Sequence, residues 1–233
     1  MREVQIGGVV SFTTIDYPGK LAAVLFLVGC PLRCTYCSNP HLLLPHDGEY
    51  DTGKILEWLR QRVGKLEAVV FSGGEALMQG DATIEYMKQV RALGFKIGLH
   101  TNGFYPETLK RASEYVDWIG LDFKATREKY PDLTGQNIAY ENMMRSLDVW
   151  LSTGKELEVR ITCDPRYVDK NDLIQIANIL SERGVKNIAV QKYVPHFEDE
   201  NNKTTDLMRN AIFMDTQLRT QIDSMFETVV WRE

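Results

Sequence analysis

The chain has 233 residues, of which 44% are hydrophobic and 25% charged, an ordinary balance for a soluble globular protein. Its net charge of −5 argues against nucleic acid as a partner. No apolar run reaches the roughly 18 residues of a membrane-spanning helix, and the first residues lack the pattern of a signal peptide. We therefore expect a cytoplasmic protein without membrane contact, folded as one domain over residues 1–233.

Short apolar segments alternate with amphipathic ones along the chain. The apolar segments predict buried strands at 22–28, 67–71, 95–99, 116–121, 157–162 and 187–191. Helices are predicted between them, at 52–63, 82–93, 107–114, 140–152 and 172–183. The last of these is the clearest, because Leu173, Ile176, Ala177 and Leu180 repeat at one-turn spacing and Gly184 follows as a stop signal.

Six strand–helix steps in sequence predict an α/β fold with parallel strands. Eight units are needed for a closed barrel, so we expect a partial (β/α)6 barrel, with a flat doubly wound sheet as the alternative. A helix at 205–223 and a strand at 228–231 are expected to close one edge, after a surface loop at 201–204. His46 and His196 are expected on the surface.

The unusual residues follow the carboxyl ends of the predicted strands. Cysteines follow the first strand, 72–75 the second and 100–103 the third, while Asp122 and Lys124 lie at the end of the fourth. Arg160 ends the fifth strand, and 191–193 end the sixth. Because the carboxyl ends of parallel strands form the active-site face of such folds, these segments predict one functional rim.

Three of the four cysteines lie within eight positions, as Cys30, Cys34 and Cys37, with the spacing C-x3-C-x2-C. Thiolates suit iron–sulfur clusters or zinc. Structural zinc needs a fourth ligand, which His41 could supply, whereas a cluster with three protein ligands keeps one iron open for a substrate. We favour the cluster, and we expect the remote Cys163 to be a small buried side chain.

This spacing, followed by Gly73-Gly74-Glu75 directly after a predicted strand, resembles the radical S-adenosylmethionine (SAM) superfamily. The resemblance implies a 4Fe–4S cluster on the three cysteines, whose open iron chelates the amino and carboxylate groups of SAM. It also implies that Tyr36 lies near the adenine. Ser72, Gly73, Gly74 and Glu75 are implied to meet the methionine amino group.

Further segments resemble one subfamily, the anaerobic ribonucleoside-triphosphate reductase activating proteins, which are glycyl-radical enzyme activases. The matching segments are 6–8, 14–20, 29–31, 39–40, 98–101 and 116–124. The resemblance implies that Asp122 and Lys124 lie by SAM, and we expect Thr101, Asn102 and Arg160 to join them. A structural ion pair is the competing interpretation of Arg160. The subfamily resemblance also implies two partners, a glycyl-radical enzyme and an electron donor, either flavodoxin or ferredoxin.

Two departures from the subfamily pattern stand out. Ser38 occupies the place of a usual histidine after the third cysteine, and His100 stands where relatives often carry aspartate beside a monovalent cation. Relatives hold that cation with the counterparts of Thr101 and Asp122. We expect SAM cleavage to survive the change at Ser38, because the cluster ligands are unaltered.

Two other functions compete with the activase. The chain could use the same radical chemistry on a small molecule or an RNA base, or it could be a non-catalytic iron–sulfur or zinc protein. For the activase, Asp16 and Lys20 are candidates to hold the partner's glycine peptide, because we expect them near the mouth of the barrel.

Overall fold

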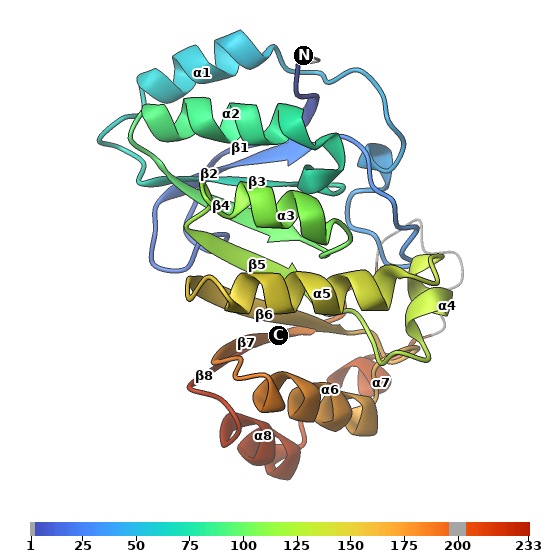
Figure 1. The fold of residues 1–233 in the computed structure, drawn as a ribbon. Coiled ribbons are helices and arrows are strands. Elements are labelled where there is room, and N and C mark those ends of the chain that lie inside the picture. Colours follow the sequence, from blue (N-terminus) through green and yellow to red (C-terminus); the bar gives the residue numbers. More distant parts are fainter. Residues whose placement is uncertain (1–2, 196–203) are drawn as a thin grey trace. The chain divides into compact units, whose positions relative to one another are not determined.

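A computed structural model describes residues 3–195 and 204–233 (Figure 1). The predicted positions 196 and 201–203 lie outside these residues. The strands are β1 (Ile6–Thr13), β2 (Ala22–Leu27), β3 (Ala68–Gly73), β4 (Lys96–Thr101), β5 (Trp118–Asp122), β6 (Glu156–Cys163), β7 (Asn187–Lys192) and β8 (Thr228–Arg232). The α-helices are α1 (Thr52–Arg60), α2 (Asp81–Ala92), α3 (Pro106–Ala112), α4 (Tyr130–Thr134), α5 (Ala139–Leu151), α6 (Lys170–Glu182), α7 (Asp206–Asn210) and α8 (Thr216–Asp223). Two short 3₁₀ helices are η1 (Pro40–Leu42) and η2 (Ala76–Gln79).

The chain forms two compact units, described separately below. The first contains residues 1–32, 39–120 and 142–156, and the second contains 33–38, 121–141 and 157–233. One boundary falls inside the cysteine loop, so Cys30 belongs to the first unit and Cys34 and Cys37 to the second. The prediction of one domain over 1–233 stays a prediction.

In the first unit, parallel strands β2, β3 and β4 pair side by side, and β1 pairs antiparallel with β2. The register places Leu27 opposite Gly73, so the cysteine loop and the Gly-Gly-Glu segment leave the sheet at the same end. Helices α1, α2 and α3 follow the strands as predicted (Figure 1). Strand β1 was not predicted, although its Val9, Val10 and Phe12 are typical strand residues.

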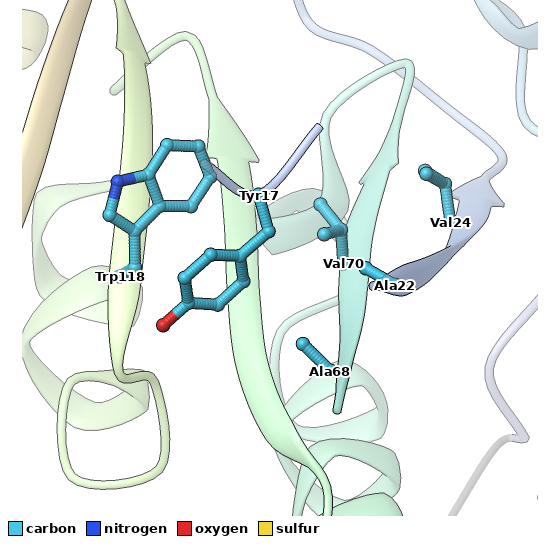
Figure 2. Close-up of a cluster of buried hydrophobic side chains, with 6 residues drawn as sticks. All are labelled: Tyr17, Ala22, Val24, Ala68, Val70 and Trp118. Carbon is cyan, nitrogen blue, oxygen red and sulfur yellow. The ribbon is translucent and has the colours of Figure 1, made fainter. Parts of the chain in front are cut away.

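The interior of the first unit includes a cluster of small side chains under two aromatic rings (Figure 2). Tyr17, from the segment after β1, stacks on Trp118 of β5 with ring centroids 5.0 Å apart. Gly98 of β4 lies beneath this pair, where a Cβ atom would stand 2.9 Å from the Tyr17 ring. The cluster fixes the segment 14–20 against the sheet, and its members are Tyr17, Ala22, Val24, Ala68, Val70 and Trp118.

In the second unit, β6, β7 and β8 are parallel neighbours. Helix α6 confirms the predicted apolar face, since Leu173, Ile176, Ala177 and Leu180 are fully buried. A capping box begins this helix at Asp169, and Gly184 beyond its end has a φ of 76°, as a helix stop requires.

The predicted helix at 205–223 is wrong as a single element, because it divides into α7 and α8. Asp215 begins the second helix by accepting a hydrogen bond from the Leu218 amide (3.0 Å), and an N-cap residue has non-helical backbone angles. The strand expected at 228–231 is confirmed as β8, parallel to β7. None of the helices among the described residues is long and apolar enough to cross a membrane.

Candidate active site

In the first unit, the Gly-Gly-Glu segment packs directly on the backbone that leads into Cys30. The Gly74 amide donates to the Leu27 carbonyl (2.9 Å), and the Glu75 amide donates to the Gly29 carbonyl (2.8 Å). A Cβ on Gly73 would lie 2.2 Å from Leu27 backbone atoms, and Gly73 has a φ of 124°. A Cβ on Gly74 would lie 2.4 Å from the Gly29 oxygen. Protein packing thus already requires both glycines.

Glu75 is 1% exposed, and its carboxylate joins the end of β3 to the end of β4. It accepts hydrogen bonds from the Leu77 amide (3.1 Å), the Asn102 amide (2.8 Å) and the Thr101 hydroxyl (2.9 and 3.0 Å). Amide donors satisfy much of the desolvation cost of a buried carboxylate. The predicted residues Glu75, Thr101 and Asn102 therefore do lie together.

Asn102 connects this network to the first cysteine of the loop. Its side-chain Nδ2 lies 3.6 Å from Cys30 Sγ, and its Oδ1 accepts from the Phe104 amide (3.0 Å). Both Asn102 and Cys30 are buried. Ser72, at the end of β3, is partly buried and lies opposite Phe26 of β2.

The structure corrects the expected place of Lys20. Lys20 lies before the amino end of β2 and pairs with Glu67 (2.9 Å), which precedes β3, whereas Cys30 follows the opposite end of β2. Asp16 accepts from the Thr13 hydroxyl through its carboxylate (2.6 Å), and its backbone oxygen contacts His100 Nε2 (2.8 Å). The placement of Lys20 near the barrel mouth was therefore wrong. The error arose because the segment is close to the cysteines in sequence but separated from them by the whole of β2.

In the second unit, the remainder of the cysteine loop is held by helix α4, which the sequence analysis missed. The Arg33 amide donates to the Thr134 carbonyl (2.8 Å) and the Thr35 amide to the Leu133 carbonyl (3.3 Å). Pro131 in the first turn and Gly135 in a left-handed cap were the available sequence signals for this short helix. The Cys37 amide donates to the Cys34 carbonyl (3.2 Å), which forms a turn between these two cysteines.

A charged and aromatic group lies beside this turn. Lys124 Nζ contacts Asp122 Oδ2 (3.2 Å) and lies 5.8 Å from the centre of the Tyr36 ring. Burial opposes the ammonium charge, but the Asp122 carboxylate, with Tyr36 and Cys34, raises the pKa of Lys124 well above its usual value. Burial raises the pKa of Cys34, and the Lys124 charge partly offsets this. The predicted residues Tyr36, Asp122 and Lys124 therefore lie together, with Lys124 charged at neutral pH.

Arg160 takes part in a buried ion-pair group. Its guanidinium donates to Glu158 (2.8 Å), which also binds Arg232 of β8 (2.9 Å). This contact agrees with the structural interpretation of Arg160, and its role in binding SAM stays a prediction.

A second group in this unit joins Asp164 and Arg166, which were not predicted, to Tyr193, which lies in the predicted rim segment 191–193. Arg166 binds the fully buried Asp164 carboxylate (2.6 Å) and donates to the Tyr193 hydroxyl (3.2 Å). The Tyr193 ring lies 6.2 Å from the Tyr36 ring. The sequence signal was the pair of charged residues Asp164 and Arg166 directly after β6.

The donor chemistry of the loop fits a thiolate-held cluster. All four cysteines are free of disulfides, and Cys163 is buried with its pKa raised by burial, as expected of an inert side chain. Within residues 3–195 and 204–233, no three His, Cys, Asp or Glu side chains form a ready-made metal site. The residues fit the cluster because three cysteines without disulfides have this spacing and the Asn102 amide is directed at Cys30.

Residues 24–180 match the radical SAM superfamily, and the chain belongs to that superfamily. The match covers the cysteine loop, the Gly-Gly-Glu segment, and β4 to β6. The family uses a 4Fe–4S cluster and SAM, so the predicted cofactors and the prediction of an enzyme are confirmed.

Two curated relatives narrow this assignment. A putative glycyl-radical enzyme activating enzyme of Methanocaldococcus jannaschii is 30% identical over 199 residues, covering 82% of this chain and 80% of that protein. The pyruvate formate-lyase-activating enzyme of Clostridium pasteurianum is 24% identical over 239 residues, covering 97% of this chain and 98% of that protein. These relatives place the chain with the glycyl-radical activases of the superfamily.

Solved structures confirm the fold. Streptococcus suis SuiB bound to its precursor peptide SuiA has a TM-score of 0.67 at 15% identity, over 87% of this chain and 46% of SuiB. SuiB bound to SAM has a TM-score of 0.66 at 16% identity, over 88% of this chain and 48% of SuiB. The chain thus spans about half the length of SuiB. The α/β partial-barrel prediction is confirmed.

Proposed function

We propose that this protein is an activase that cleaves SAM reductively and generates a glycyl radical on a partner, an anaerobic ribonucleoside-triphosphate reductase. The observation that carries the activase is the 30% identity to an activating enzyme over 82% of the chain. The choice of reductase is supported by the segments 14–20 and 116–124, which resemble activators of that enzyme. A reduced flavodoxin or ferredoxin is proposed as electron donor.

Cys30, Cys34 and Cys37 are the proposed ligands of the cluster. When bound and reduced, the cluster would supply one electron for the cleavage of SAM into methionine and a 5′-deoxyadenosyl radical. Because the loop offers three thiolates and not four, it would leave room at the cluster for the amino and carboxylate groups of SAM.

The remaining site residues bind and orient SAM in this proposal. Lys124 supplies a cation for the methionine carboxylate, held in place by Asp122 and by the ring of Tyr36. Tyr36 provides a flat apolar surface for the adenine. Glu75 supplies negative charge for the methionine amino group. Thr101 and Asn102 hold the Glu75 carboxylate in place by donating hydrogen bonds to it.

The radical must meet the partner's glycine at near-contact distance to remove a hydrogen from its α-carbon. The C–H bond breaks homolytically, so the hydrogen moves to 5′-deoxyadenosine and the unpaired electron stays on the glycine. Deuterium placed on that α-carbon therefore follows the reaction directly.

The test mixes anaerobically reconstituted protein, SAM and dithionite with a reductase that carries deuterated glycine. We expect deuterium in 5′-deoxyadenosine and a glycyl-radical signal in electron paramagnetic resonance. Cys37→Ala should abolish both, whereas Cys163→Ala, a matched thiol loss away from the loop, should preserve both. If deuterium reaches 5′-deoxyadenosine from another glycyl-radical enzyme but not from the reductase, the activase function stands and the proposed partner is wrong. Transfer only from a small metabolite or an RNA would replace the activase with the competing enzyme function.

A further inference from the structure

The side chain of Asn102 is aimed at a proposed cluster ligand 72 positions earlier in the chain. Its amide Nδ2 lies 3.6 Å from Cys30 Sγ, a normal separation for a hydrogen bond to the large sulfur atom. Asn102 is 7% exposed and Cys30 6% exposed, so bulk water does not weaken this contact.

The orientation of the amide follows from its other bond. The Phe104 amide is a donor only, so the Asn102 atom that it contacts at 3.0 Å must be the acceptor Oδ1. The NH₂ group therefore faces Cys30. The Asn102 backbone is fixed as well, because its N–H donates to buried Glu75 (2.8 Å). The Ser146 hydroxyl holds the same turn from outside through the Gly103 carbonyl (2.6 Å).

We propose that Asn102 is a positioning residue that sets the reduction potential of the cluster through an N–H···S bond to Cys30. This inference rests on the proposed ligation by Cys30, Cys34 and Cys37. The reduced cluster carries one more negative charge than the oxidised one, so a donor to a ligating sulfur stabilises the reduced state more. Hydrogen bonds to the sulfurs and burial are established determinants of cluster potential. Asn102 thereby eases the uptake of one electron from a low-potential flavin or iron–sulfur donor.

Two substitutions at Asn102 separate the donor from charge and shape. Asn102→Asp keeps an acceptor for the Phe104 amide but replaces the donor with a negative charge. Asn102→Leu removes the donor with similar volume and no charge. Ser146→Ala is the matched control, because it loosens the same turn through Gly103 and leaves the N–H···S bond in place.

The experiment is a potentiometric titration of the reconstituted full chain, without SAM or partner, followed by the paramagnetic signal of the reduced cluster. At the wild-type midpoint, we expect both Asn102 variants to show an approximately tenfold lower ratio of reduced to oxidised cluster. This tenfold decrease corresponds to a midpoint potential about 59 mV lower for a one-electron couple. Ser146→Ala should keep the ratio within about twofold.

Iron and sulfide analysis of each sample distinguishes failure of the cluster from failure of the inference. Wild-type protein without a cluster overturns the proposed ligation and this inference with it. A normally loaded Asn102→Leu protein with the wild-type midpoint overturns the inference alone, as does an equal shift in Ser146→Ala. If neither Asn102 variant loads, wild-type protein labelled with ¹⁵N in its asparagine side chains decides. Pulsed paramagnetic resonance should then detect an amide nitrogen coupled to the cluster, and its absence overturns the proposal.

Discussion

The residues around the cysteine loop differ in kind between the two compact units. Beside Cys30, the first unit uses close backbone contacts at Gly73 and Gly74 and a buried carboxylate, Glu75, bound mainly by amide N–H groups. Beside Cys34 and Cys37, the second unit holds the loop through the backbone of α4 and adds a charged side chain, Lys124, which contacts the Asp122 carboxylate and lies near the Tyr36 ring.

This difference separates two kinds of sensitivity. The backbone at Gly73 and Gly74 lies so close to neighbouring backbone that no added side-chain atom fits there. Substitutions near Cys30 should therefore act mainly on folding. The Lys124–Asp122 pair joins a buried ammonium to a 42% exposed carboxylate, and the cost of burying the ammonium offsets much of their attraction. Changes at Lys124 should therefore act mainly on binding.

The largest expected effect is that of Gly73→Ala. The new Cβ would lie 2.2 Å from Leu27 backbone atoms at a φ of 124°, so steric overlap and backbone strain add together. We expect the free energy of unfolding to fall by about 4 kcal/mol or more, as measured by urea denaturation.

Gly94→Ala is the control for this substitution. Gly94 has a φ of 97° but no atoms within 4 Å of the new Cβ, so it reports strain without overlap. We expect a loss of about 1–2 kcal/mol. Equal losses in the two variants would show that the packing of Gly73 on β2 is not what requires glycine there.

The second effect in size is that of Glu75→Gln. The uncharged amide weakens the bonds from Leu77 and Asn102 and turns an NH₂ group towards one of these donors. We expect the free energy of unfolding to fall by about 2–3 kcal/mol, together with weaker SAM binding by calorimetry. Glu67→Gln is the control, because it removes the charge of an exposed carboxylate that pairs with Lys20. It should have little effect on either measurement. Wild-type stability in Glu75→Gln would contradict a structural role for the carboxylate.

The order of elements was predictable because each buried strand is a short apolar run and each main helix has an apolar face. Helix α6 shows this best, with its periodic residues, capping aspartate and terminal glycine all agreeing. Strand β1 was missed because its residues 10–12 are exposed and it pairs antiparallel with β2, whereas β2–β4 and β6–β8 pair in parallel. Helix α4 was missed because five residues are too few to show a period.

The site was predictable to the level of strand ends but not of contacts. Position after a strand correctly grouped Glu75 with Thr101, and Tyr36 with Lys124. Spacing could not show that the glycines pack on β2, because that depends on the strand register. It also could not separate the two ends of β2, which is why Lys20 was misplaced.

The smallest expected effect on folding is that of Lys124→Met, which should nonetheless impair binding most selectively. Methionine is an unbranched apolar side chain of similar length that removes only the buried charge, and Asp122 is exposed enough to be hydrated alone. The free energy of unfolding should therefore change by less than about 1 kcal/mol. Loss of the cation should weaken SAM binding about 10- to 100-fold by the free energy of a charge-assisted hydrogen bond. Lys129→Met, a more exposed lysine paired with Asp172, is the control and should bind SAM normally.

The pH dependence of wild-type binding tests the same lysine. Its pKa is raised in the folded protein, so the stabilising charge is fully present below the unfolded value of about 10.4 and is lost only as pH rises through the folded value. The α-amino group of SAM itself titrates in this region, so the quantity that reports Lys124 is the ratio of the SAM affinities of wild-type protein and Lys124→Met. This ratio should therefore stay level from about pH 7 to 9 at constant ionic strength. A decline of this ratio across that window would show that the ammonium loses its proton early. The contrast between the two units would then fail, because the second unit would lack the fixed charge on which binding is argued to depend.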